Sequence, residues 1–148
     1  MLWYYILMRL WHYKMIPVLP RKQLISQLRE CVLIGKNLFE KGTPNHIIVN
    51  RAALYYHSSQ DYAKYCKLLI DEIRNRGYNV SDKTVEKLNR YCKTDIEKLE
   101  VSPLDILFEE FHNERYLRQC YYNLQEKYDD GIIPEEEWKK LYDWYSSY

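Results

Sequence analysis

One carboxylate in this chain lies among basic residues on the first predicted helix. Lys22, Arg29 and Lys36 are spaced by seven residues, which is two helical turns, so their side chains share one stripe. Glu30 lies beside that stripe. A carboxylate in this position could simply form an ion pair within the helix. Alternatively, Arg29 and its neighbours keep Glu30 ionised while the helix faces a polyanion, where a carboxylate can stabilise positive charge that develops at a sugar carbon.

The charge of the whole chain hides a division that supports a polyanionic partner. The 148 residues carry a formal net charge of +1, which by itself argues against a basic nucleic-acid binder. Residues 8–94, however, hold 16 Lys+Arg against 7 Asp+Glu, a net charge of +9, and residues 95–148 hold 6 against 14, a net charge of −8. Such an asymmetry predicts a basic working face and an acidic face opposed to it.

Composition and periodicity predict a compact all-α fold in one domain over residues 8–148, preceded by an extension over residues 1–7. The chain is 47% hydrophobic, and its 4 glycines and 5 prolines argue against a turn-rich barrel or sandwich. We expect residues 37–57 to be irregular. A period of 3.6 residues recurs elsewhere and predicts six helices. They run from Pro20 to Gly35 or a little beyond, from Ser58 or Ser59 to Arg76, from Ser81, from Ser102-Pro103 as a short helix, over 113–128, and from Pro134.

The cysteines argue against a metal site and against secretion. Cys31, Cys66, Cys92 and Cys120 are 35, 26 and 28 residues apart, contain no C-x-x-C pair and fall at apolar helical positions. We therefore expect reduced core thiols, no metal and a cytoplasmic protein, associated with the nucleoid if the source is bacterial or archaeal. The apolar run at the N-terminus is too short to span a bilayer, so we expect no membrane partner.

An ordered set of short motifs resembles a family of DNA repair enzymes. The motifs are Met8-Arg9-Leu10-Trp11-His12, Leu19-Pro20-Arg21-x-Gln23-Leu24, Arg29-Glu30-Cys31, Arg76-Gly77-Tyr78-Asn79-Val80-x-Asp82-x-Thr84-Val85 and His112-x-x-x-Tyr116-Leu117-x-x-Cys120-x-x-Asn123-Leu124-x-x-Lys127. Together they cover most of residues 8–127. In this order they resemble the pyrimidine-dimer DNA glycosylases of the phage endonuclease V type, and more closely their short bacterial relatives.

The resemblance implies a helical glycosylase and abasic-site lyase, without a cofactor, that acts as a monomer on damaged double-stranded DNA. In such enzymes a free α-amine at the chain start attacks C1′ of the sugar, and a Schiff base and β-elimination follow. Glu30 matches the essential glutamate of the family, and Arg29 matches an arginine that is suited to a phosphate contact. The further DNA contacts that we expect come from Arg21, Lys22, Lys36 and His12.

The position of the nucleophilic amine departs from the family pattern. Counting back from Glu30 without gaps, the phage nucleophile falls on Arg9, and methionine is not normally removed before so large a residue. A chain that starts at Met8 would carry its amine there, one residue out of register, and we expect this amine to be the nucleophile. A second active-site arginine of the phage enzyme falls on Leu33, where only Lys36 offers a substitute.

Two other functions are compatible with the same sequence features. A non-catalytic binder of damaged or distorted DNA would use the same fold and the same basic stripe without breaking the strand. A helical protein-interaction module would dock its aromatic N-terminus on a partner and would show no affinity for DNA. Enzymatic activity, as a DNA N-glycosylase and abasic-site lyase, is the hypothesis that the ordered motifs favour.

Overall fold

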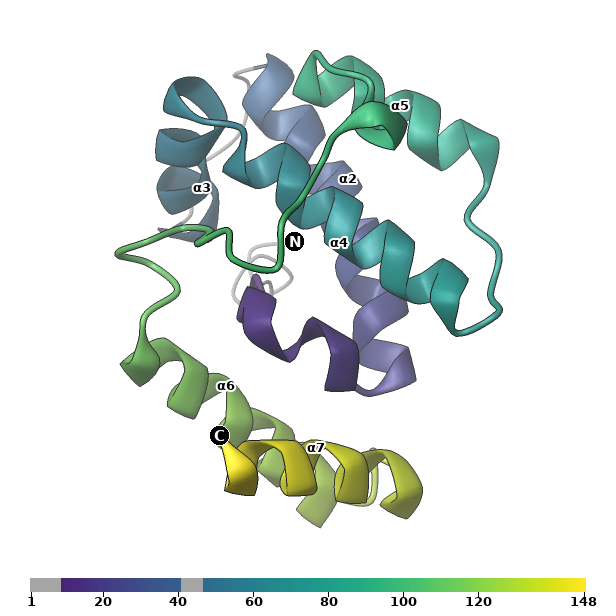
Figure 1. Cartoon of the computed structure of the whole chain (residues 1–148), viewed down its shortest axis with the longest axis vertical. Helices are drawn as coiled ribbons and strands as arrows, with labels where there is room; N and C mark the ends of the chain where they lie inside the picture. The colour runs from purple at the N-terminus through teal and green to yellow at the C-terminus, as the bar shows by residue number, and fades with distance from the viewer. Residues whose placement is uncertain (1–8, 41–46) are drawn as a thin grey trace.

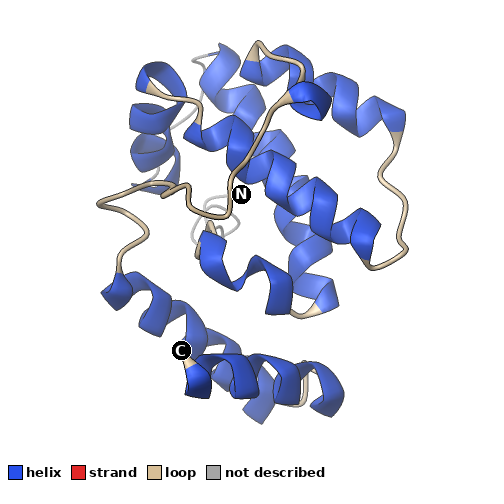
Figure 2. Ribbon diagram, in the orientation of Figure 1, coloured by secondary structure: helices blue, strands red, loops and turns tan. Residues whose placement is uncertain are grey.

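The computed structural model describes residues 9–40 and 47–148, and in these residues the fold is all-α, without a strand (Figure 2). Residues 1–8, which include the expected extension and Met8, lie outside the described residues. The helices are η1 (Tyr13–Val18), α2 (Arg21–Glu40), α3 (Ile47–Ser58), α4 (Asp61–Asn75), α5 (Asp82–Cys92), η2 (Ile96–Lys98), α6 (Glu114–Asp129) and α7 (Glu135–Ser147). No helix in the described part of the chain is both long and apolar enough to cross a membrane.

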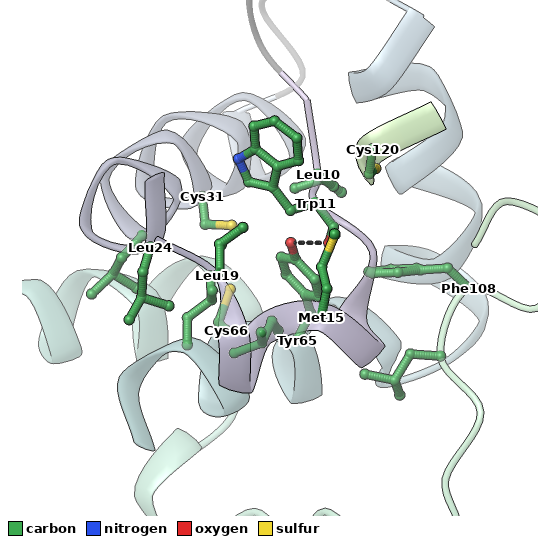
Figure 3. Packing of buried hydrophobic residues seen from close by; sticks show 14 of the residues in the cluster. Leu10, Trp11, Met15, Leu19, Leu24, Cys31, Tyr65, Cys66, Phe108 and Cys120 are labelled. Atoms are coloured by element: carbon green, nitrogen blue, oxygen red, sulfur yellow. Dashed lines mark hydrogen bonds between the residues drawn. The ribbon is translucent and has the colours of Figure 1, made fainter. Parts of the chain in front are cut away.

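The helices form two groups that meet along η1. Helix α2 packs against α3, α4 and α5, while α6 pairs with α7 and α7 contacts η1. Figure 1 shows the α6–α7 pair on one side of the molecule, with η1 between it and the other group. The buried apolar side chains of both groups belong to one continuous cluster, which Figure 3 shows from close by.

The helices predicted from Ser58 or Ser59 to Arg76, from Ser81, over 113–128 and from Pro134 are confirmed as α4, α5, α6 and α7, apart from their exact ends. Helix α4 ends close to the predicted Arg76, because the next residue, Gly77, has a φ of +88° and the Tyr78 N–H binds the Ile73 carbonyl at 3.1 Å. Helix α5 begins at the predicted cap, where the Ser81 side chain accepts a hydrogen bond from the Thr84 N–H.

One predicted helix is longer than expected, and two other predictions about helices were wrong. Helix α2 continues past Gly35 to Glu40 because Gly35 is buried against Tyr91 and Tyr62, and this packing outweighs the low helix propensity of glycine. Residues 47–58, which we expected to be irregular, form α3. The short helix expected at Ser102 is instead a turn.

Candidate active site at the start of the chain

The main chain of residues 9–12, here called the chain-start segment, crosses α2 and is held there by one side chain. Gln27 of α2 accepts a hydrogen bond from the Trp11 N–H through Oε1 at 2.6 Å. Its Nε2 donates to the Arg9 carbonyl oxygen at 2.7 Å. Because Gln27 lies on the inward face of the helix, these bonds form away from solvent and fix the segment against α2.

Two tyrosines from other helices bind two further carbonyls of the chain-start segment. Tyr65 of α4 donates to the Trp11 carbonyl at 2.5 Å, and Tyr116 of α6 donates to the Leu10 carbonyl at 2.8 Å. Figure 3 shows Tyr65 directed at the chain beside Trp11 and Leu10. Burying an unpaired main-chain group is costly, so these hydroxyls make the buried course of the segment possible. Side chains of three helices thus define where the chain start lies.

Glu30 faces the first residue of this segment. Its carboxylate accepts a hydrogen bond from Gln27 Nε2 at 3.2 Å. Burial raises the pKa of the Glu30 carboxyl to about 7, against the opposing effects of the nearby Arg9 main-chain N–H and the positive charges of Arg9 and Lys127. Near neutral pH this group is therefore present in both forms, as a general acid or base requires.

The ionisation of Glu30 differs from the sequence-based expectation. In one of the two alternatives Arg29 and its neighbours keep the carboxyl ionised, but the cations that act on Glu30 are Arg9 and Lys127. Arg29 is exposed on a neighbouring face of α2, and burial of the carboxyl outweighs the nearby charges. An ion pair between Glu30 and a residue of the basic stripe is likewise absent among the described residues.

The basic stripe is open to solvent. Lys22, Arg29 and Lys36 are all exposed along α2, and none of them pairs with a carboxylate in the part of the chain that the structure describes. Leu33, which stands where the phage enzyme has its second arginine, is 41% exposed beside them. The unpaired cations leave this side of α2 available to phosphates.

Arg21 is more constrained than the rest of the basic residues. Its main-chain N–H donates to Glu137 of α7 at 2.5 Å, so an acidic side chain of the C-terminal group caps the first turn of α2. Its guanidinium carbon lies 5.4 Å from the centre of the Tyr78 ring, and a guanidinium nitrogen lies 3.5 Å from the Tyr78 hydroxyl. Arg21 therefore lies on the surface but is engaged by two neighbours.

His12 does not fit the DNA contact expected of it, because its side chain is 1% exposed. It stacks on His112, with ring centres 5.0 Å apart, and its Nε2 binds the His112 carbonyl oxygen at 2.8 Å. In turn, His112 Nδ1 accepts a hydrogen bond from the Tyr13 N–H at 3.1 Å. Burial lowers the pKa of His12 to about 4, so both its burial and its neutrality point to a structural role.

A hollow of about 390 Å³ lies between α3 and α6. Arg51 and Tyr55 of α3 line one side, and Arg115 and Tyr116 of α6 line the other. Tyr116 connects the hollow to the site because the same side chain binds the Leu10 carbonyl. The lining combines aromatic rings with two arginines and one carboxylate, that of Glu110, and the rings offer a surface suited to stacking.

Sequence reasoning missed the side chains that hold the site together. Gln27, Tyr65, Tyr116 and Lys127 were not among the predicted site residues. The available signal for Gln27 was a polar residue on the apolar stripe of the first helix, one turn before Glu30. The three others are distant from Glu30 in the sequence, and only the fold brings them to the chain-start segment.

Comparison with known proteins gives one match. The family model described as pyrimidine dimer DNA glycosylase matches residues 8–94, which include the chain-start segment, Gln27 and Glu30. No curated protein and no solved structure matches the chain.

Proposed function

Because the chain belongs to the pyrimidine dimer DNA glycosylase family, we propose that it cuts the glycosidic bond of a damaged pyrimidine in duplex DNA and then breaks the strand. Membership of the family establishes DNA repair of the glycosylase type as its function at the level of the family. The lesion that we propose is a pyrimidine dimer or a related product. The strand break makes the enzyme an abasic-site lyase as well as a DNA N-glycosylase.

The proposed reaction uses a chain-start amine and Glu30. The amine nitrogen bonds to C1′ while the bond from C1′ to the base breaks, and the base leaves with the electron pair and takes up a proton. Opening of the sugar ring gives an imine between the amine nitrogen and C1′. Loss of a proton from C2′ then expels the 3′ phosphate. Glu30 would stabilise the positive charge at C1′ and relay protons, as its pKa of about 7 allows.

The observation that carries this proposal is that Gln27 Nε2 binds both the Arg9 carbonyl oxygen, at 2.7 Å, and Glu30 Oε2, at 3.2 Å, so that the main chain of residue 9 lies beside the Glu30 carboxylate. The nitrogen of residue 9 is the position of the family nucleophile when counted back from Glu30. In a chain that begins at Arg9 the α-amine would lie at the carboxylate. In a chain that begins at Met8, the expected amine lies one residue before it. The geometry therefore favours Arg9 over Met8 as the source of the nucleophile.

DNA would bind along the exposed stripe of Lys22, Arg29 and Lys36, next to Glu30. Contacts to phosphates would position the duplex, while the hollow beside Tyr116 offers room for a base outside the stack. We further propose that the protein acts as a monomer without a cofactor. Its four free cysteines fit a reducing compartment that holds the DNA.

Trapping with borohydride on DNA that contains an abasic site tests the proposal. The chain as given, a chain that starts at Met8 and a chain that starts at Arg9 are compared, each with and without Glu30→Gln. We expect a covalent adduct from the Arg9-start or Met8-start chain, and Glu30→Gln should slow its formation about 10²- to 10⁴-fold. Absence of an adduct from every chain, or an equal adduct in the Glu30→Gln variants, would refute the proposed mechanism.

A non-catalytic binder of distorted DNA is the second candidate, and one observation favours it. Leu33, which is 41% exposed, stands where the phage enzyme has its second active-site arginine, so one group of the family's catalytic set is missing. Such a protein would bind DNA with strong salt dependence and would neither form an adduct nor nick the strand. The same trapping experiment separates the two candidates, because only the enzyme forms a covalent bond.

A further inference from the structure

Gln27 makes an unusually complete set of hydrogen bonds for a buried amide. Its side chain is 0% exposed, and both of its polar atoms have two neighbours. Oε1 accepts from the Trp11 N–H at 2.6 Å and lies 3.0 Å from the Tyr65 hydroxyl. Nε2 donates to the Arg9 carbonyl at 2.7 Å and to Glu30 Oε2 at 3.2 Å. The reverse orientation of the amide would place its oxygen against two acceptors, so only one orientation is possible.

This amide acts on the chain start as a neighbouring strand would. A peptide group in a sheet accepts from one N–H and donates to one carbonyl of the adjacent chain. Gln27 does the same with Trp11 and Arg9, which are two residues apart. The second N–H of Nε2 is left over from this pairing and points at Glu30. One side chain thus sets both the register of the chain-start segment and the orientation of the carboxylate.

We propose that Gln27 is the positioning residue of this site, which holds the main chain of residue 9 at the Glu30 carboxylate. It does not touch the reacting atoms itself. As a claim about catalysis this inference rests on the proposed function, whereas the arrangement around Glu30 can be tested without any activity. The groups that face Glu30 are the Arg9 main chain, Gln27 and the charges of Arg9 and Lys127.

Gln23 provides a matched control on the same helix. It lies one turn before Gln27, is 8% exposed, and its Oε1 has no hydrogen-bond partner among the described residues. Replacing either glutamine by methionine removes a buried amide from α2 and keeps a flexible side chain of similar length. Only the replacement of Gln27 removes a hydrogen bond to Glu30. A change in the pKa of Glu30 that occurs in Gln27→Met and not in Gln23→Met therefore comes from the lost contact with Glu30 and not from altering the core in general.

The first experiment titrates Glu30 in the full chain by carbon NMR of labelled glutamate, with the signal assigned through Glu30→Gln. Loss of a donor to the ionised form raises a carboxyl pKa, so we expect Gln27→Met to move the midpoint upward from about 7 by about one pH unit. Gln23→Met should leave the midpoint in place. An unchanged midpoint in Gln27→Met, or an equal shift in Gln23→Met, would overturn the proposal.

A second variant keeps the test decisive if Gln27→Met does not fold. Gln27→Glu has nearly the same shape and places a second carboxyl against Glu30. Two carboxyls in contact share a proton, so we expect the pair to titrate in two separated steps, with the upper midpoint well above 7. Two independent midpoints near the values of ordinary glutamates would show that residues 27 and 30 do not contact each other and would refute the proposal.

A kinetic experiment connects the positioning to the reaction. Of the chains that begin at Met1, Met8 and Arg9, the one that forms the adduct fastest serves as the parent. In this parent, Gln27→Met should slow adduct formation at saturating DNA by tenfold or more. Its affinity for DNA should stay within about twofold of the parent's. Gln23→Met should match the parent in both. Equal rates in the Gln27→Met variant and its parent would contradict the positioning role. If no parent chain forms an adduct, the proposed function fails, and the titration still decides the arrangement around Glu30.

Discussion

The two parts of the chain differ in charge and in what they contribute to the site. Residues 8–94, which the family model matches, carry the basic stripe and Glu30, with a net charge of +9. Residues 95–148 have a net charge of −8 and carry none of the residues predicted for catalysis. The structure nevertheless joins the C-terminal part to the chain start, through the Tyr116 hydroxyl and the His112 ring.

Residues 8–94 supply the groups proposed for catalysis, whereas residues 95–148 help to hold these groups in place. The charge of Lys127 in α6 acts on Glu30, and Glu137 in α7 caps α2 through the Arg21 N–H. Residues 95–148 therefore form no ion pair with the exposed lysines of the basic stripe, all of which the structure describes, and they pack against the rest of the protein. They hold the chain-start segment against α2 from the opposite side.

We expect the largest effect on stability from removing the His112 side chain, which joins the C-terminal part to the chain-start segment and Tyr13. His112→Ala removes the stacking partner of His12 and the acceptor of the Tyr13 N–H, and so leaves that partly buried N–H unpaired. We expect a loss of about 2–4 kcal/mol in the free energy of unfolding, measured with urea, together with slower adduct formation. The exposed His57 is the control, and His57→Ala should change the free energy by less than about 0.5 kcal/mol. A neutral His112→Ala would mean that the C-terminal part does not support the site.

A smaller effect concerns the pH dependence of stability. The pKa of Glu30 is raised from 4.5 to about 7 on folding, so its stabilising effect is present below pH 4.5 and is lost as the pH rises towards 7. His12 behaves oppositely, since its pKa falls from 6.5 to about 4 and its contribution is lost as the pH falls through that range.

Relative to the wild type, Glu30→Gln should therefore gain about 1–3 kcal/mol in free energy of unfolding as the pH rises from 4.5 to 7. His12→Gln should instead gain on the wild type as the pH falls from 6.5 to 4. Urea unfolding at a series of pH values measures both differences. A pH-independent difference for Glu30→Gln would show that its carboxyl is not buried as the structure has it.

The smallest effect that we expect is on the salt dependence of DNA affinity, which should differ between the surface of residues 8–94 and that of residues 95–148. Lys22→Ala, on the basic stripe, should reduce the slope of log affinity for DNA against log salt by about 0.9, because one fewer counterion is released. Lys140→Ala, at an exposed lysine of α7, should leave the slope unchanged. Fluorescence anisotropy over a range of salt concentrations measures both slopes. Equal reductions in the two variants would place DNA on both surfaces.

Much of the fold could be predicted from the sequence, because most helices carry their own periodicity and end signals. The apolar stripe of α4 and Gly77 after it are local features, and so is the Ser81 cap of α5. Helix α3 escaped prediction because its apolar residues are spread around the helix and not gathered into a stripe. The continuation of α2 past Gly35 depends on packing against Tyr91, which the sequence near Gly35 does not reveal.

The candidate site could be predicted only in part. Glu30 and the basic stripe follow from spacing along one helix, and the structure leaves the stripe exposed. The burial of Glu30 depends on contacts with Arg9, from outside that helix, and so could not be read from its neighbours in sequence. His12 was misassigned for a similar reason, because its partner His112 belongs to the other part of the chain.

The central claim, that the nitrogen at the start of the chain reacts beside Glu30, has a direct measurement. Borohydride-trapped adducts of the Arg9-start and Met8-start chains with abasic DNA are digested, and tandem mass spectrometry locates the linkage. We predict that the sugar remnant is on the α-nitrogen of the first residue and that the Arg9-start chain reacts faster. A linkage to the side chain of Lys14 or Lys22, or no adduct from either chain, would contradict the account.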